Sequence, residues 1–245
     1  METHSHRACA TKVRIMDAAE RLFALQGVDA TSLREITRAA AVNLAAVNYH
    51  FGSKEGLIHA ALRRRVQPIN EERLRLLAAY EASVPQGSPL ELEQVLAAFL
   101  RPVFDVHRAA RDPLFLRLIG RIYSETSPGL RELFLRELSA VLHRYLAALG
   151  RALPKASPDD LHWGLFFTVG IMGQCLLAGD SLRVFTHGSC DVNDHESVVV
   201  RLIAFAAAGF RAGPLEPRAR TGLTDATPTP EPSHARVAQP RQRRS

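Results

Sequence analysis

The chain has 245 residues, 47% of them hydrophobic, so it can form one large or two small domains around a buried core. Its formal net charge of +6 favours a polyanionic partner, although many proteins reach this charge. Three cysteines without a CxxC pair argue against a disulfide framework and favour a reducing cytoplasm, and no signal peptide is visible at the polar N-terminus.

The first predicted helix runs from Thr11 to Gln26, because apolar side chains recur there at a helical spacing. Gly27 supplies a C-terminal stop for this helix. Residues 1–10, which precede the apolar pattern, are expected to form a flexible N-terminus.

A short second helix is predicted to open at Ser32, which fits a capping box with Glu35 three residues later. After a tight turn over 40–43, a third helix is expected from about Leu44 to His50. Two short helices joined by a turn form a helix-turn-helix, whose second helix enters the major groove of DNA. Ser53 is positioned to cap a long fourth helix.

The third helix and its flanks supply the candidate DNA contacts. Small side chains let the backbone approach base edges, and an alanine methyl group can contact a thymine methyl group. No arginine lies between Val42 and Phe51, so specificity is expected to depend partly on methyl contacts and DNA shape. Tyr49 could instead pack against the fourth helix, and Lys54 could be an ordinary solvated lysine. The predicted DNA-binding residues are Thr31, Ser32, Arg34, Asn43, Leu44, Ala45, Ala46, Asn48, Tyr49, His50 and Lys54.

Residues from about 11 to 58 resemble the DNA-binding domain of the tetracycline-repressor (TetR/AcrR) family. The resemblance extends nearly end to end over IMDAAERLFALQGVDATSLREITRAAAVNLAAVNYHFGSKEGLI. It implies that Tyr49 and His50 reach phosphates, that residues 11–55 form the DNA-binding head, and that residues 56–212 form an all-helical ligand-binding and dimerisation domain, the body. The segment VNLAAVNYHFGSK is also similar to an acyl-sensing branch that controls fatty-acid metabolism.

The remaining sequence predicts long helices separated by loops rich in Ser, Pro and Gly. The first of these helices links the head to the body and could transmit motion between them. The predicted ranges are Gly56–Tyr80, Leu90–His107, Pro113–Ser124, Leu130–Leu153, Asp159–Leu177 and Glu196–Phe210. Together with the head they predict an all-α fold of about nine helices.

The last two predicted helices are apolar almost all round, whereas a helix on the surface of a monomer keeps one polar face. A four-helix interface with a second chain would explain this composition, and the core of a monomer is the alternative. Polar residues within 161–178 argue against a membrane span. The predicted dimer-interface residues are Gly170, Gly173, Gln174, Leu177, Val199, Ile203, Ala207 and Phe210.

The resemblance implies that a small molecule bound in the body releases the DNA, which requires tighter binding to the released conformation. Apolar and aromatic side chains from separate helices could enclose one cavity, although they would equally make a filled core. The predicted ligand-binding residues are Phe99, Phe104, Phe115, Leu118, Arg121, Ile122, Leu142, Tyr145, Trp163, Phe166 and Phe167. A long-chain acyl group, free or linked to coenzyme A, is the leading effector, and an aromatic or drug-like compound is the alternative.

The sequence contains no Gly-rich phosphate loop, GxSxG or HExxH motif, so a non-enzymatic protein without a cofactor is expected. His187 and Cys190 with nearby acidic residues could gather a metal, but their spacing matches no standard zinc pattern. Residues 213–245 are rich in Pro and Arg and are predicted to be a disordered tail. The resulting prediction is a cytoplasmic, homodimeric repressor on a palindromic operator in double-stranded DNA. A DNA-binding protein without an effector is the alternative.

Overall fold

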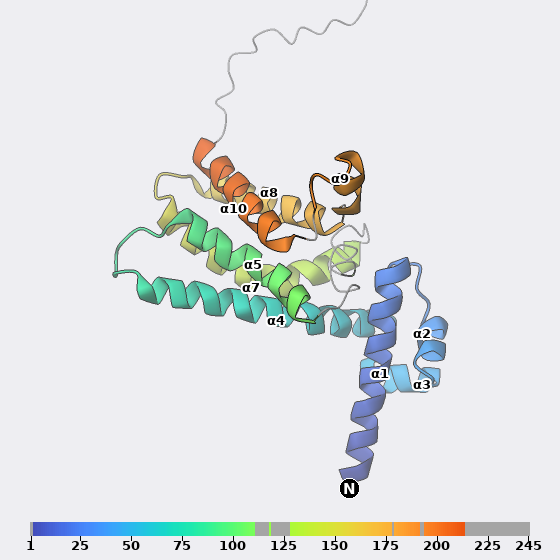
Figure 1. The fold of residues 1–245 in the computed structure, drawn as a ribbon. Helices are drawn as coiled ribbons and strands as arrows, with labels where there is room; N and C mark the ends of the chain where they lie inside the picture. Colours follow the sequence, from blue (N-terminus) through green and yellow to red (C-terminus); the bar gives the residue numbers. More distant parts are fainter. Residues whose placement is uncertain (1, 111–117, 119–127, 178, 192–193, 214–245) are drawn as a thin grey trace, which may run out of the picture. The chain divides into compact units, whose positions relative to one another are not determined.

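The computed structural model describes residues 2–110, 118, 128–177, 179–191 and 194–213. The regular structure of these residues is entirely α-helical, as predicted, and comprises nine helices (Figure 1). They are α1 (Glu2–Gln26), α2 (Leu33–Ala39), α3 (Leu44–Phe51), α4 (Lys54–Ser83), α5 (Leu92–Ala110), α7 (Pro128–Ala152), α8 (Pro158–Leu177), α9 (Gly179–Phe185) and α10 (His195–Ala212). The helix predicted over 113–124, apart from Leu118, and the tail predicted after Gly213 lie outside the described residues.

Helix α1 begins at Glu2 instead of the predicted Thr11 and therefore includes residues that we expected to be flexible. No glycine or proline lies between Glu2 and Thr11, so nothing in this segment interrupts the helix. The helix ends at Gln26, as predicted. Gly27 follows with a φ of 93°, a left-handed conformation that favours glycine at the end of a helix.

The caps predicted for the short helices are present. The Ser32 hydroxyl accepts a hydrogen bond from the Glu35 N–H at 3.3 Å, and the Glu35 carboxylate accepts one from the Ser32 N–H at 2.8 Å. This reciprocal pair is the capping box expected at the start of α2. At the start of α3, the Asn43 side-chain oxygen accepts a hydrogen bond from the Ala46 N–H at 2.9 Å. Both short helices therefore begin where local hydrogen bonding places them.

The corner between α3 and α4 depends on two glycines. Gly52 follows α3 with a φ of 75°, and the Ser53 hydroxyl then accepts the Gly56 N–H at 3.1 Å to cap α4. A Cβ atom on Gly56 would lie only 2.0 Å from the carbonyl oxygen of Phe51. Glycine is therefore required at this point, and the corner holds α3 against α4.

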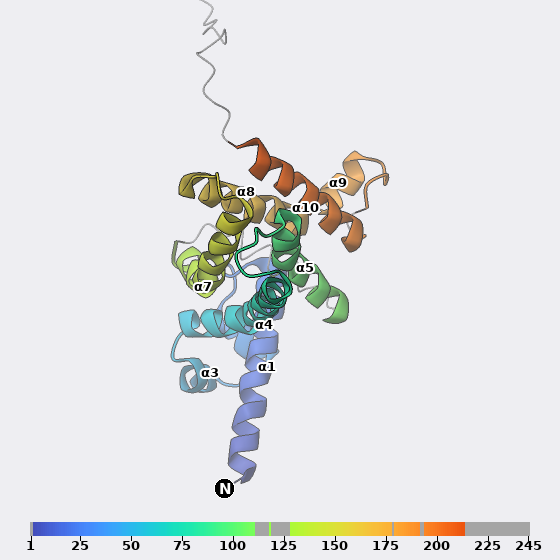
Figure 2. The same ribbon diagram turned by 90° about the vertical axis from the view of Figure 1, so that its left-hand side faces the viewer.

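Helix α4 connects the head to the body, because it packs against α1 and α3 as well as against α5 and α7. Figures 1 and 2 show α5 and α7 lying along α4, with α8 and α10 on the side of α5 and α7 that faces away from α4. A single cluster of buried apolar side chains extends from α1 to α10. Movement of α4 would therefore disturb the packing of both the head and the body.

Ion pairs join α4 to the head. Arg64 pairs with Asp17 of α1 at 2.7 Å, and the Arg65 Nε donates to the Glu20 carboxylate of α1 at 2.7 Å. Glu20 is almost fully buried, and this burial raises the pKa of its carboxyl group, while the hydrogen bond and charge of Arg65 oppose the rise.

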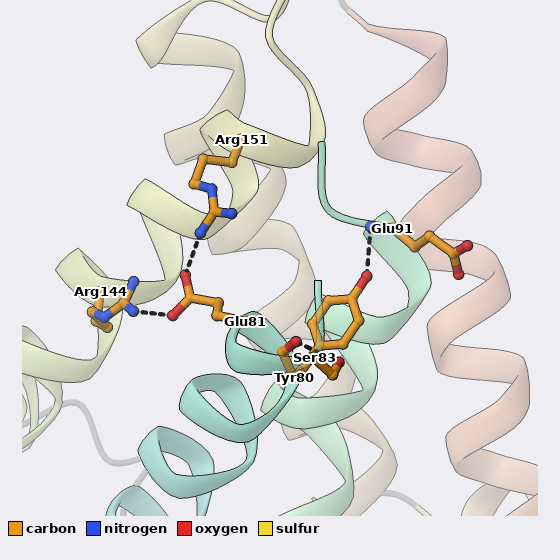
Figure 3. Close-up of polar contacts among 6 residues, drawn as sticks. All are labelled: Tyr80, Glu81, Ser83, Glu91, Arg144 and Arg151. Carbon is orange, nitrogen blue, oxygen red and sulfur yellow. Dashed lines mark hydrogen bonds and ion pairs between the residues drawn. The ribbon is translucent and has the colours of Figure 1, made fainter. Parts of the chain in front are cut away.

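The C-terminal end of α4 is held to α7 and to the segment that leads into α5 (Figure 3). The Glu81 carboxylate accepts hydrogen bonds from Arg144 and, at 2.9 Å, from Arg151, both of α7. The Tyr80 hydroxyl accepts the N–H of Glu91 at 2.8 Å and so joins the two sides of the connecting loop. Ion pairs thus attach α4 to α1 near one end and to α7 at the other.

The sequence does not predict α9, because seven residues are too few to display a helical period and no capping box marks its start, as Ser32 and Glu35 mark that of α2. Helices α8 and α10 pack against each other, and α10 also packs against α5. The Phe210 ring lies so close to Gly164 that a Cβ atom there would be 2.2 Å from it. None of the described helices has both the length and the apolar composition needed to cross a membrane.

Candidate nucleic-acid interface

Helix α3 has one face anchored in the core and one face in solvent. Val47 is fully buried, whereas Leu44, Ala45, Asn48 and Tyr49 are exposed. The structure therefore brings these four predicted contact residues to one exposed surface, which we call the α3 face. A short helix that packs against the core through its opposite face can enter a groove of DNA without losing that packing.

The aromatic end of α3 is well placed to meet a phosphate backbone. The Tyr49 side chain is 81% exposed, so the alternative in which it packs against α4 does not hold. Its ring meets that of the half-buried His50 edge to face, with centroids 4.9 Å apart. Lys12 of α1 lies 5.9 Å from the Phe51 ring centroid, which brings a cation to this end of α3. Sequence reasoning missed Lys12, because its proximity to α3 arises only from the packing of α1 on α3.

The structure corrects the prediction for Thr31. This side chain is 1% exposed, and its hydroxyl donates to the Gly27 carbonyl oxygen at 2.6 Å and accepts from Gln26 at 3.3 Å. It closes the turn between α1 and α2, so its side chain does not reach the surface. Ser32 is exposed, but its hydroxyl lies 2.7 Å from the Glu35 carboxylate, whose pKa is lowered by this hydrogen bond. A negative charge at that distance would weaken a phosphate contact made by Ser32.

Other predicted DNA contacts lie at the borders of the α3 face. Asn43 uses its side-chain oxygen to cap α3, which leaves its amide nitrogen as the donor at this exposed position. Arg34 is exposed on α2, where Arg38 is a second exposed cation, and Lys54 is partly exposed at the start of α4. Ala46 is half-buried, so less of its methyl surface than that of Ala45 is accessible. Cations therefore lie on helices that border α3, an arrangement that suits phosphates on either side of a groove.

The predicted ligand-binding residues divide into two groups. One group is interior: Phe99, Phe104, Leu118 and Tyr145 are buried, and Leu142 is half-buried. The Phe99 and Tyr145 rings meet edge to face, with centroids 5.0 Å apart. The three aromatic residues of α8 do not join this group, because their side chains are exposed and contact one another. They are Trp163, Phe166 and Phe167. Phe115, Arg121 and Ile122 lie outside the described residues.

The predicted dimer-interface residues also divide, because α10 packs against α5 and α8 of its own chain. The buried members are Gly173, Val199, Ile203 and Ala207, the half-buried members are Gly170 and Phe210, and Gln174 is exposed. The Leu177 side chain lies outside the described part of the structure. The large exposed apolar side chains of this helix pair are Trp163, Phe166 and Phe167 of α8 with Val200 and Phe205 of α10. We call these five residues the α8–α10 apolar face.

No three His, Cys, Asp or Glu side chains among the described residues are grouped closely enough to hold a metal ion. The metal-binding alternative around His187 and Cys190 therefore has no site in that part of the chain. Both side chains are exposed in the segment that connects α9 to α10. Three regions of the described structure remain as candidate sites: the α3 face, the interior of the body and the α8–α10 apolar face.

Two protein-family models match the chain. The model "Bacterial regulatory proteins, tetR family" matches residues 15–61, and "Tetracyclin repressor-like, C-terminal domain" matches residues 97–209. The HTH-type transcriptional regulator AcrR of Shigella flexneri is 39% identical over 82 residues, which are 34% of this chain and 36% of AcrR. The match thus spans about a third of the length of this relative.

Solved structures share the fold. A tetR family transcription regulator from Shewanella sp. PV-4 has a TM-score of 0.55 and 19% identity, covering 84% of this chain and 99% of its own. FadR of Bacillus subtilis, solved in complex with stearoyl-CoA, has a TM-score of 0.54 and 14% identity, covering 80% of this chain and 98% of its own. The two family models span the head and most of the body, and the helix-turn-helix and all-helical body agree with them. The chain belongs to the TetR family of bacterial transcriptional regulators.

Proposed function

We propose that the protein is a homodimeric, ligand-responsive repressor that binds a palindromic operator and is released by an apolar small molecule. The observation that supports it most is the exposed α3 face, anchored by Val47 and bordered by cations on α1, α2 and α4. A dimer presents two such faces, which suit half-sites in successive major grooves.

Each α3 face would divide its contacts between bases and phosphates. Ala45 and Asn48 are exposed near the middle of the helix and would contact base edges. Tyr49, Lys12 and Lys54 would contact phosphates, which set the position of the helix in the groove. Because phosphate neutralisation releases counterions, operator affinity would fall steeply as salt concentration rises.

We propose that the α8–α10 apolar face joins two copies of the chain. Its large apolar side chains are exposed on two helices that pack against each other, and burying such side chains against a second copy is favourable. In a two-fold dimer each residue is used twice. Replacing Phe205, which is 69% exposed, with Ser is therefore expected to weaken dimerisation about tenfold or more.

Sedimentation velocity measured over a range of concentrations tests this interface. Leu135→Ser is the matched control, because Leu135 is also an exposed apolar residue but lies on α7. The expected result is a shift toward monomer for Phe205→Ser alone. An equal shift in both variants, or in neither, would contradict the assignment.

The effector would act through α4. This helix is ion-paired to α1 of the head and to α7 of the body, so a ligand that displaced it would reorient α3. Buried aromatic side chains, including Phe99 and Tyr145, favour a ligand with an apolar part, and an acyl chain is the leading candidate. FadR, which has a similar fold, was solved with stearoyl-CoA. Aromatic or drug-like effectors, or no effector, are the alternative outcomes of the test.

The test is selection of bound sequences from random duplex DNA by the full chain, followed by release assays. We expect an inverted repeat to be enriched and two chains to bind each selected duplex. Addition of palmitate or stearoyl-CoA is expected to lower the affinity for that duplex. Enrichment of no sequence would contradict the proposal that the protein binds an operator. Release by drugs but by neither acyl compound would contradict the acyl chain as effector and favour a drug-like one.

A further inference from the structure

A buried arginine lies in the middle of α4. Arg73 is only 3% exposed, and among the described residues no Asp or Glu pairs with it. Glu20 of α1, which is also buried and charged, does have partners of opposite charge: it pairs with Arg65 and with Arg64. Arg73 is therefore an interior cation for which this part of the chain supplies no counter-ion.

The hydrogen bonds that Arg73 makes to described residues reach neutral acceptors. Its Nε donates to the Phe99 carbonyl oxygen at 2.8 Å and its Nη1 donates to the Asn70 side-chain oxygen at 3.3 Å. Its Nη2 lies 3.7 Å from the Met172 sulfur, which is a weak acceptor. A guanidinium has five N–H donors, so the two terminal nitrogens keep capacity for a stronger acceptor.

The contacts of Arg73, backbone included, come from four helices. Its central carbon lies 4.1 Å from the centre of the Phe99 ring of α5, Met172 belongs to α8, and the Tyr145 hydroxyl of α7 donates to the Arg73 carbonyl oxygen at 2.8 Å. A molecule held at this point would touch the elements that position α4.

Burial lowers the pKa of Arg73 to about 10, so the side chain remains a cation at neutral pH. A buried charge without a counter-ion destabilises the fold. An anion that pairs with it through two parallel hydrogen bonds neutralises the charge and so stabilises the fold. A carboxylate has the planar geometry that matches the guanidinium. A neutral ester or thioester carbonyl accepts hydrogen bonds but supplies no charge.

We propose that Arg73 anchors the carboxylate of an apolar acid, with the rest of that acid lying among the aromatic side chains around Phe99 and Tyr145. This inference rests on the proposed ligand-responsive function and narrows its effector to free acids. The carboxylate would replace the Met172 sulfur as the acceptor for Nη2. Because Arg73 lies on α4, the bond would act directly on the helix that connects body and head.

Thermal unfolding of the full-length protein tests the proposal with octanoate, dodecanoate, palmitate and phenylacetate, each compared with its methyl ester. We expect at least one acid to raise the Tm of the wild type by several degrees and its ester to give a much smaller shift. Arg73→Gln is expected to abolish the acid-dependent shift and Arg73→Lys to keep part of it. Arg75→Gln is the matched control, because Arg75 is exposed on the same helix and pairs with Glu72.

The unliganded protein gives a second readout. Arg73→Met fills a similar volume without charge, so we expect its Tm to equal or exceed that of the wild type. A Tm well below that of Arg75→Gln would show that the guanidinium serves the fold, and would overturn the proposal. Equal shifts with acid and ester, an unchanged shift in Arg73→Gln, or no shift with any acid would also overturn it.

Failure of this inference can be separated from failure of the proposed function. If esters or drugs release the selected duplex and no acid acts through Arg73, ligand-responsive repression stands and the carboxylate anchor fails. If the wild type binds no duplex but acids stabilise it through Arg73, the anchor stands and the operator fails.

Discussion

Replacing Tyr49 with Ala probes the proposed DNA interface with little disturbance of the fold. Because the side chain is 81% exposed, the free energy of unfolding should change by no more than about 0.5 kcal/mol. A hydrogen bond from a tyrosine hydroxyl to a charged phosphate contributes about 1.5 kcal/mol. Two heads would together lose about 3 kcal/mol, which weakens operator binding roughly a hundredfold.

Fluorescence anisotropy of a labelled operator at fixed salt measures this effect, with chemical denaturation in parallel. Tyr49→Phe keeps the ring and removes the hydroxyl, so it should reproduce most of the loss if the contact is a hydrogen bond. Val47→Ala is the contrasting control, because Val47 is fully buried and its truncation should reduce stability by about 1–3 kcal/mol. Unchanged operator affinity in Tyr49→Ala would refute the phosphate contact.

Two further predictions concern the fold that holds the α3 face in place. Gly56→Ala would place its Cβ atom 2.0 Å from the Phe51 carbonyl oxygen and should destabilise the protein by about 3 kcal/mol. Gly209→Ala is the control, because the space around Gly209 is open and its Cβ atom should not destabilise the protein. Thermal unfolding compares the two variants, and equal Tm values would contradict the requirement for glycine at the corner between α3 and α4. Burial raises the pKa of Glu20 despite Arg65, so its contribution to stability is complete below its ordinary pKa and is lost as pH rises through the raised value. The stability of the wild type relative to Glu20→Gln should therefore fall from about pH 4.5 upward, and a difference that is flat or grows would contradict this assignment.

The short helices α2 and α3 could be predicted from the sequence almost to the residue, because their boundaries depend on local chemistry, whereas α1 begins nine residues before its predicted start. Ser32, Asn43 and Ser53 each accept a backbone N–H three residues later, a pattern visible in the sequence itself. The prediction of DNA contacts failed where a polar side chain instead forms a hydrogen bond within its own turn. Thr31 looks like a surface hydroxyl at a helix start, yet it bonds to the carbonyl oxygen of Gly27 inside the turn.

The sequence predicts which segments of the body are helical, but it does not predict which side of each helix is buried. Helices α8 and α10 are apolar nearly all round, so their periodicity does not indicate which side contacts α5 and which side faces solvent. This is why Trp163 was assigned to the interior and Ile203 to the interface, whereas the structure exposes the first and buries the second. Arg73 carries no distinguishing signal in a helix with several arginines, because its burial arises only from the packing of α5, α7 and α8 around it.

Hydrogen exchange of the full chain, measured with and without the selected duplex, tests the central claim most directly. The account predicts that DNA slows amide exchange in peptides that cover α2, α3 and the start of α4, near Lys54. Peptides from α8 and α10 should change little, since we place them at the dimer interface in both states. Protection concentrated in the body, with none over α3, would contradict the claim that this helix binds DNA.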